Sequence, residues 1–426
     1  MNTKQKSYAL PIAMMFALFF MISFVTGFPN PLGVIVRHQF GASNFLSSLG
    51  NAANFIAYAF MGIPAGILLE KVGYKKTALL AIIVGFTGVA IQFISGQIGS
   101  FFVYLMGAFI SGFSMCMLNT VVNPMLNTLG GGGKKGNQLI QFGGSINSIG
   151  ATIVPVLVGY LIGNVATATI KDANPALFIA MGIFALAFFV LFFVDIPEPH
   201  MINKKEKKQP NQHSALSFRH FILGIIAIFV YVGVEVGIPN TTNLFMTSSG
   251  DGGLNISAII AGTVVGTYWF LMLIGRLTGA SMGAKISSRA MLAFAASLAI
   301  IFLLIAIFSP VTTTVKMPVF RSDISFGLAE VPISVMFLIL VGICTSVMWG
   351  SIFNLAVEGL GKYTAMASGI FMVMVCGGGI LPMIQGFIAD KFGYISSYWV
   401  IVVGVAYILF FALIGSKNVN KDIPVE

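Results

Sequence analysis

The sequence predicts an all-α membrane protein with twelve transmembrane helices, built as two related six-helix bundles. Composition is the first observation: 57% of the residues are hydrophobic and 8% are charged, too little charge to cover a soluble protein. The second is that apolar runs of about twenty residues match the ~30 Å hydrocarbon core of a bilayer. The third is a set of motifs that recurs in both halves. Soluble enzymes and disordered chains are excluded.

Twelve spans follow from the apolar runs and from the Gly, Pro and charged breaks between them. We expect the first to be a retained helix and not a signal peptide, because Lys4 and Lys6 precede it and no small-residue cleavage site follows. The spans are 8–36, 44–70, 76–95, 100–129, 137–163, 174–195, 218–247, 256–283, 288–308, 331–360, 362–390 and 394–415.

The distribution of Lys and Arg predicts the orientation of the chain. With a cytoplasmic N-terminus, 17 of the 23 basic residues fall in inner segments and five in outer segments, while Arg276 lies within a helix. Basic residues accumulate on the cytoplasmic side of membrane proteins, so both termini are expected to be cytoplasmic. The net charge of +10 therefore reflects topology, and no nucleic-acid partner is expected.

An internal repeat divides the chain into an N-terminal bundle 1–195, a basic cytoplasmic linker 196–217 and a C-terminal bundle 218–426. Gly27-Phe-Pro-Asn30 recurs as Gly237-Ile-Pro-Asn240, an offset of 210. Later pairs, such as Asn127 with Asn354, are offset by 227. The change of 17 residues is accounted for by an extra polar stretch around 309–330 on the outer side. Parallel halves of this kind enclose a central substrate site in transporters.

Polar residues inside the spans are the candidate site, because such groups normally face a bundle interior or a wet cavity. The alternative is that they hydrogen-bond between neighbouring helices. Asn119, Asn123 and Asn127 follow at steps of four on one helix face, and alternating amide donors and acceptors suit sugar hydroxyls. For Asn119 and Asn123 we favour a cavity, and for Asn127 capping or gating. The candidate substrate-binding residues are Asn30, Asn51, Asn54, Asn119, Asn123, Gln141, Asn147, Asn240, Asn243 and Asn354.

Glu235 is the candidate ion-coupling residue. It lies four residues before Pro239, so its own carbonyl loses its helical donor. A carboxylate and a bare carbonyl together form a plausible site for a proton or small cation. The alternative is a buried Glu that hydrogen-bonds to Asn or Thr or is kept neutral. Gating or structural roles are predicted for the remaining charges in or near the spans, which are Glu70, Lys71, Arg276 and Glu358.

No pattern supports bond-making chemistry, an organic cofactor or a metal. The four His lie in loops or at helix ends, and none has a Cys, Asp or Glu at metal-ligand spacing. The run Gly131–Lys135 lacks the preceding strand and the spacing of a phosphate loop. A coupling ion, proton or sodium, is the one small cofactor expected.

Several motifs resemble the fucose:proton symporter family of the major facilitator superfamily. They are Ile63-Pro-Ala-Gly66 with Gly73-Tyr-Lys75, Asn123-Pro124 before Leu129-Gly130, Asn147-Ser-Ile-Gly150, Gly359-Leu-Gly361, Gly377-Gly-Gly379, Pro382, Gln385-Gly386 and Ala389-Asp390. Tyr231-Val-Gly-Val-Glu-Val236 is similar to the glucose/galactose transporter branch.

The resemblance implies the twelve-helix major facilitator fold and import of a monosaccharide, energised by a proton or by sodium. The family's proton-coupled fucose members carry an Asp in helix 1 and a Glu in helix 4, and these positions align with Pro31 and Asn119. A sugar-contacting Gln falls on Gly144, whereas the neighbouring Asn is kept as Asn147. The binding site is therefore remodelled, and Glu235 is left as the coupling candidate.

These observations predict a monomeric, multi-pass transporter of the bacterial inner membrane that imports a hexose or hexose derivative by alternating access, coupled to a cation. A sugar uniporter is the main alternative, because the family's carboxylates are replaced. An exporter of lipophilic compounds fits the Asn residues poorly, and a membrane sensor would need a soluble signalling domain that no cytoplasmic segment is long enough to supply.

Overall fold

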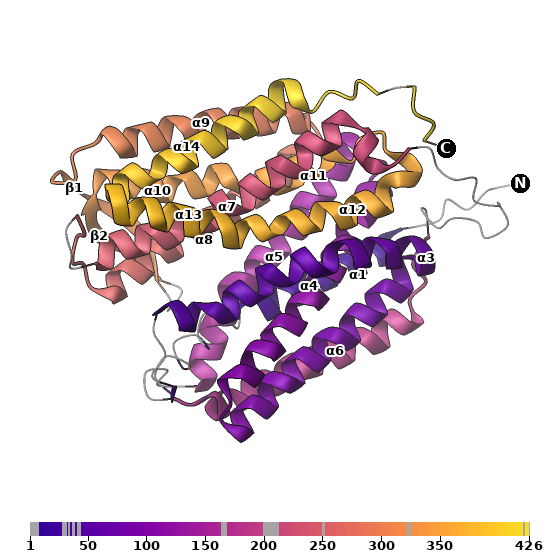
Figure 1. The fold of residues 1–426 in the computed structure, drawn as a ribbon, viewed down its shortest axis with the longest axis horizontal. Coiled ribbons are helices and arrows are strands. Elements are labelled where there is room, and N and C mark those ends of the chain that lie inside the picture. Colours follow the sequence, from indigo (N-terminus) through magenta and orange to yellow (C-terminus); the bar gives the residue numbers. More distant parts are fainter. Residues whose placement is uncertain are drawn as a thin grey trace, which may run out of the picture. The chain divides into compact units, whose positions relative to one another are not determined.

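The computed structural model describes residues 8–27, 32, 35, 39–40, 44–162, 168–198, 213–248, 252–321, 325–420 and 422–425. Helices dominate this part of the chain, and they divide between two compact units (Figure 1). Among the described residues, nine helices are long and apolar enough to cross a membrane, and Ala9–Phe24 is a shorter apolar helix.

The first unit comprises Met1–Ala215 together with two later segments, Gly359–Val373 and Pro424–Glu426. Its helices are α1 (Ala9–Gly27), α3 (Asn44–Ile98), α4 (Phe101–Leu129), α5 (Gly133–Ile162), α6 (Asn174–Phe193) and α12 (Thr364–Val373), with 3-10 turns at Ile170–Ala173 and Gly361–Tyr363.

The second unit comprises Leu216–Glu358 and Met374–Ile423. Its helices are α7 (Arg219–Thr247), α8 (Ala258–Met282), α9 (Ser288–Phe308), α10 (Ile333–Thr345), α11 (Met348–Ala356), α13 (Gly377–Phe392) and α14 (Tyr394–Phe410). Strands β1 (Thr314–Phe320) and β2 (Phe326–Pro332), a 3-10 turn at Met374–Cys376 and a π-helical turn at Phe411–Gly415 complete it.

Each of the twelve predicted spans corresponds to described helix, although the breaks differ from those expected. The second and third spans merge into α3, whose backbone breaks at Gly73 with φ 86°, a value that favours glycine. The tenth span is interrupted between α10 and α11, and the eleventh by the turn Met374–Cys376. Discontinuous helices of this kind commonly form binding sites in transporters.

Serine caps and small residues explain the local architecture. The side chains of Ser100, Ser257 and Ser287 accept from a backbone N–H in the first turn of α4, α8 and α9, as expected of N-cap residues. Within α3 and α4, a Cβ added to Gly107 would lie 2.8 Å from the backbone N of Gln92. Glycine thus lets the two helices approach closely, as is common in membrane bundles.

The predicted polar stretch around 309–330 lies between helices as expected, and its described residues add a hairpin that the sequence did not predict. Strands β1 and β2 pair antiparallel there, from Thr314↔Pro332 at the base to Phe320↔Phe326 at the tip. The alternation of burial along β1 explains the structure, since Met317 and Val319 are buried and their neighbours Lys316 and Pro318 are exposed.

The division by packing differs from the sequence repeat in two segments, Gly359–Val373 and the short Pro424–Glu426. Residues 359–373 belong to the second sequence half, but α12 packs on α3 within the first unit. Glycines make this contact possible: a Cβ added to Gly369 would lie 2.5 Å from the Gly62 carbonyl oxygen and 2.6 Å from the Gly66 Cα. The linker expected at 196–217 lies largely outside the described residues.

Candidate functional site

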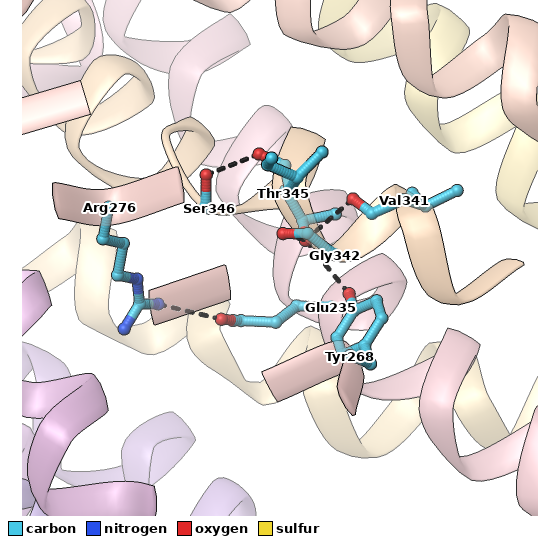
Figure 2. Close-up of polar contacts among 8 residues, drawn as sticks. Glu235, Tyr268, Arg276, Val341, Gly342, Thr345 and Ser346 are labelled. Carbon is cyan, nitrogen blue, oxygen red and sulfur yellow. Dashed lines mark hydrogen bonds and ion pairs between the residues drawn. The ribbon is translucent and has the colours of Figure 1, made fainter. Parts of the chain in front are cut away.

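An ion pair between α7 and α8 is the chemical centre of the second unit. The Arg276 Nη2 donates to Glu235 Oε1 at 3.1 Å, and the side chains are 11% and 14% exposed. Figure 2 shows the two side chains reaching toward each other across the helices. Because both charges are nearly removed from solvent, each depends on the other for compensation. The sequence analysis predicts separate roles for Glu235 and Arg276, whereas the structure shows that the two side chains form an ion pair.

Aromatic side chains surround this pair. Tyr231 lies one turn before Glu235 on α7, is fully buried, and its hydroxyl is close enough to interact electrostatically with both Glu235 and Arg276. The ring of Trp349 meets the Tyr231 ring edge-on, with centroids 6.3 Å apart. Trp349 is itself half-buried, so one part of this aromatic pair remains accessible beside the charges.

The break between α10 and α11 lies next to the pair. Tyr268 on α8 shares a hydrogen bond with Thr345 Oγ1 at 3.1 Å (Figure 2). Thr345 and Ser346 turn their hydroxyls back to the carbonyls of Gly342 and Ile343, at 3.1 Å and 2.6 Å. Side-chain hydroxyls thus satisfy the backbone groups at the end of α10, and the polar break is held beside Glu235.

The part of α7 that follows Pro239 presents exposed amides. Pro239 lies within this helix, so the carbonyl of Glu235 lacks its helical donor. Asn240 and Asn243 beyond it are exposed on the unit, whereas Thr241 and Thr242 are buried. Exposed amides within an apolar helix are costly in lipid, and the binding role of these two residues stays a prediction.

In the first unit, Asn119 and Asn123 form a short polar chain between α3 and α4. The Asn119 amide donates to the Tyr58 hydroxyl at 2.9 Å and to the Met115 carbonyl at 3.1 Å. Asn123 donates to the Asn119 carbonyl at 2.9 Å and is 0% exposed, whereas Asn119 is 7% exposed. Asn119 is therefore the better placed of the two to reach a cavity.

The other predicted binding residues in described regions lie in helix seams. Asn147 donates to the Phe19 carbonyl at 3.2 Å, joining α5 to α1. Asn354 donates to Ser288 Oγ at 2.8 Å, joining α11 to α9. Asn54 and Gln141 are buried, Asn54 beside Gly112 of α4. Asn30 and the Asn51 side chain lie outside the described residues.

The predicted gating residues lie near the ends of helices. Glu70 is half-buried and Lys71 is exposed, both just before the Gly73 break, and Glu358 is exposed after α11. The Glu358 carbonyl bonds the buried His220 ring at 2.9 Å. At the Gly73 break, Glu198 accepts from the backbone N–H groups of Tyr74 and Lys75, a contact that the sequence did not predict.

Sequence reasoning missed the aromatic part of the site. Tyr231, Tyr268 and Trp349 look like ordinary apolar-face residues, which is why they were not singled out. The spacing of four between Tyr231 and Glu235 was the available signal, because residues four apart share a helix face. No group of three His, Cys, Asp or Glu that could hold a metal ion occurs among the residues that the structure describes.

Comparison with known proteins identifies the class. The Major Facilitator Superfamily model matches residues 14–382. The "Glucose/galactose transporter" of Brucella abortus biovar 1 (strain 9-941) is 31% identical, with 98% of this chain and 97% of that protein covered. The "L-fucose-proton symporter" of Escherichia coli (strain K12) is 24% identical, with 92% and 90% covered.

The fold has a close match among solved structures. A crystal structure of a major facilitator transporter, FucP, in the outward conformation has a TM-score of 0.80 at 22% identity and covers 97% of this chain and 100% of that one. A proton:xylose symporter, XylE, has a TM-score of 0.71 at 13% identity and covers 96% of each chain.

The family model and the named relatives define a multi-pass membrane transporter and not an enzyme. This chain belongs to the major facilitator superfamily. The resemblance to the family of the fucose-proton symporter and the glucose/galactose transporters is confirmed, and so is the predicted fold.

Proposed function

We propose that this transporter imports a monosaccharide, a hexose or hexose derivative, and couples uptake to a cation through Glu235 and Arg276. The full-length similarity to proteins named glucose/galactose transporters supports the substrate class. The ion pair carries the proposal: two charges that are 14% and 11% exposed at membrane depth are expensive unless they serve function.

The surroundings of the pair suit a sugar. A hexose presents hydroxyl groups at its edge and apolar C–H groups on its faces. Glu235 and Arg276 offer acceptors and donors for hydroxyls, and the half-buried Trp349 offers a flat apolar surface for a ring face. Asn240 and Asn243, on the same helix as Glu235, would supply further hydrogen bonds.

Coupling follows from the chemistry of the pair. While Glu235 is ionised, it holds the Arg276 guanidinium at 3.1 Å. Protonation of the carboxylate, or binding of a cation to it, weakens this attraction and frees Arg276 to donate to the sugar or to another acceptor. A two-state element of this kind lets ion and sugar bias the same conformational equilibrium.

The proposed setting is the bacterial inner membrane, with both termini cytoplasmic and the transporter acting as a monomer. The excess of basic residues in the predicted inner segments supports this orientation. Oligomerisation is not needed for the site, since the Glu235–Arg276 pair lies within one unit of one chain.

Uptake into proteoliposomes tests the proposal. Purified protein is given a panel of labelled hexoses with proton and sodium gradients imposed separately. We expect concentrative uptake under one gradient, and Glu235→Gln is expected to abolish accumulation while leaving exchange across the membrane. The matched control is Asp422→Asn, an exposed carboxylate near the C-terminus, which should accumulate sugar normally.

The outcomes separate the alternatives. Equilibration that neither gradient drives would identify a uniporter. Concentrative uptake that survives Glu235→Gln would remove the pair from coupling. Export of lipophilic compounds, with no sugar uptake under either gradient, would overturn the substrate class.

A further inference from the structure

The segment between α9 and α10 turns back along α8. Its base lies where α10 begins, because the backbone N of Ile333 donates to the Thr313 carbonyl at 3.0 Å. Seven cross-strand pairs then lead to the tip, where Phe320 faces Phe326. Figure 1 shows β1 and β2 together at the left end of the second unit.

Contacts at the tip fix its level on α8. The rings of Phe320 and Phe270 stack with centroids 4.4 Å apart and planes 6° apart. The backbone N–H of Phe320 donates to Thr267 Oγ1 at 2.9 Å. The apolar span of α8 begins at Ile260, so at ~1.5 Å per residue the tip contacts helix roughly 10–15 Å along that span. The tip thus contacts α8 beyond the first turn of its apolar span.

The exposed face of the hairpin is charged toward the base and apolar toward the tip, and it is the open backbone edges of the hairpin that are not suited to lipid. Met317, Val319 and Val331 are buried on one face, and Lys316 and Glu330 are exposed on the other, paired across the strands. The outer edge of each strand in a two-stranded ribbon also lacks a ladder partner. Non-helical backbone at membrane depth is tolerated only where protein buries it or where it lines water.

We infer that this hairpin forms part of the wall of the water-filled path through which solute reaches the second unit. Phe326 and Leu328, 67% and 63% exposed, make an apolar lip toward the inner end of that wall. At this lip, the two apolar side chains favour compact solutes that carry apolar ring faces over charged ones. The inference deepens the proposed function and depends on its orientation of the chain.

Cysteine labelling tests the location. In a background with Cys116, Cys344 and Cys376 replaced by Ala, Phe326→Cys and Leu328→Cys are treated in intact cells with a charged, membrane-impermeant methanethiosulfonate. Thr314→Cys, at the exposed base, is the aqueous control. Ile301→Cys on α9 is the lipid control, since Ile301 is 52% exposed near the middle of this apolar helix.

The two lip positions should react at least about ten-fold faster than Ile301→Cys, because the reactive thiolate forms in water and not in lipid. Melting temperatures of the purified variants check that each is folded. Labelling as slow as that of Ile301→Cys would place the hairpin face in lipid and overturn the inference.

Transport provides the second arm. Modification of Leu328→Cys adds a bulky sulfonate to the lip and should reduce uptake of the transported solute at least about ten-fold, against little change at Thr314→Cys; a saturating concentration of that solute should slow the labelling. Rapid labelling without loss of uptake would make the hairpin a surface loop and overturn the inference. If no hexose is transported but modification blocks uptake of another solute, the wall stands and the proposed substrate class fails.

Discussion

At the residue scale, Glu235 and Arg276 act on stability as well as on transport. Removing one charge leaves the other nearly buried and uncompensated, which destabilises a folded protein by about 3 kcal/mol when a buried pair is broken. We therefore expect Glu235→Gln to lower the melting temperature in detergent. The double variant Glu235→Gln/Arg276→Gln should recover most of that loss, because neither charge remains. A double variant that melts as low as the single one would show that the pair is not the cause.

Asn119 and Asn123 permit a sharper prediction than their spacing alone. Asn119 keeps 7% exposure beside Tyr58, whereas Asn123 is 0% exposed and bonds its own helix. Asn119→Ala should raise the apparent Km for sugar about ten-fold, the loss expected for one hydrogen bond of roughly 1.4 kcal/mol. Asn123→Ala should mainly lower the melting temperature. If sugar uptake by Asn119→Ala saturates at the same concentrations as in the unmodified protein, Asn119 serves helix packing and not sugar binding.

Glu235 and Arg276 could be identified as intramembrane charges from the sequence, but their ion pair could not be predicted. Glu235 was singled out because a carboxylate in an apolar span is expensive, an argument that needs no structure. Its contact with Arg276 joins residues 41 positions apart, and no local pattern encodes such a distance. Tyr231 and Trp349 were missed for a related reason: an aromatic residue in an apolar run is equally compatible with lipid, core or cavity.

At the scale of elements, the packing of α10 on α8 supports the charged site. A Cβ added to Gly342 would lie 2.6 Å from the Tyr268 carbonyl oxygen, a backbone atom that cannot move without moving α8. Gly342→Ala should therefore push the helices apart, at about 1–3 kcal/mol of stability, and reduce uptake. The control is Gly262→Ala on α8, where a Cβ meets nothing within 4 Å. Equal melting temperatures and uptake for the two variants would contradict this account.

Spans were predictable from sequence, and their interruptions were not. Apolar runs define where helices form because the bilayer demands internal hydrogen bonding. The breaks after Thr345 and at Met374–Cys376 contain no proline and no charged residue. A hydropathy pattern therefore does not reveal them. The hairpin was expected as a polar loop for the same reason: its strands are short, and their alternation becomes meaningful only once α8 provides a surface.

At the scale of the whole molecule, the repeat and the packing assign the helix-forming segment Gly359–Val373 differently. Offsets of 210 and 227 between matched motifs place 359–373 in the second half, yet α12 packs on α3 with the first unit. The sequence repeat shows which segments correspond between the two halves, whereas the contacts show how the segments pack in one conformation. Alternating access requires the two sequence halves to move. Because α12 belongs to the second sequence half but packs on α3, we expect the α3–α12 contact to break and re-form during the transport cycle.

The glycines at that contact make the idea testable. A Cβ at Gly369 would meet the Gly62 carbonyl oxygen at 2.5 Å, and backbone cannot yield without separating the helices. Gly369→Ala should therefore slow uptake at least about five-fold while changing sugar affinity little, because it alters the balance between conformations and not the site. Gly386→Ala on α13, where a Cβ meets nothing within 4 Å, is the matched control. Comparing maximal uptake rate with equilibrium sugar binding distinguishes the two effects. A Gly369→Ala protein that transports at the control's rate would mean that the α3–α12 contact does not move during the cycle.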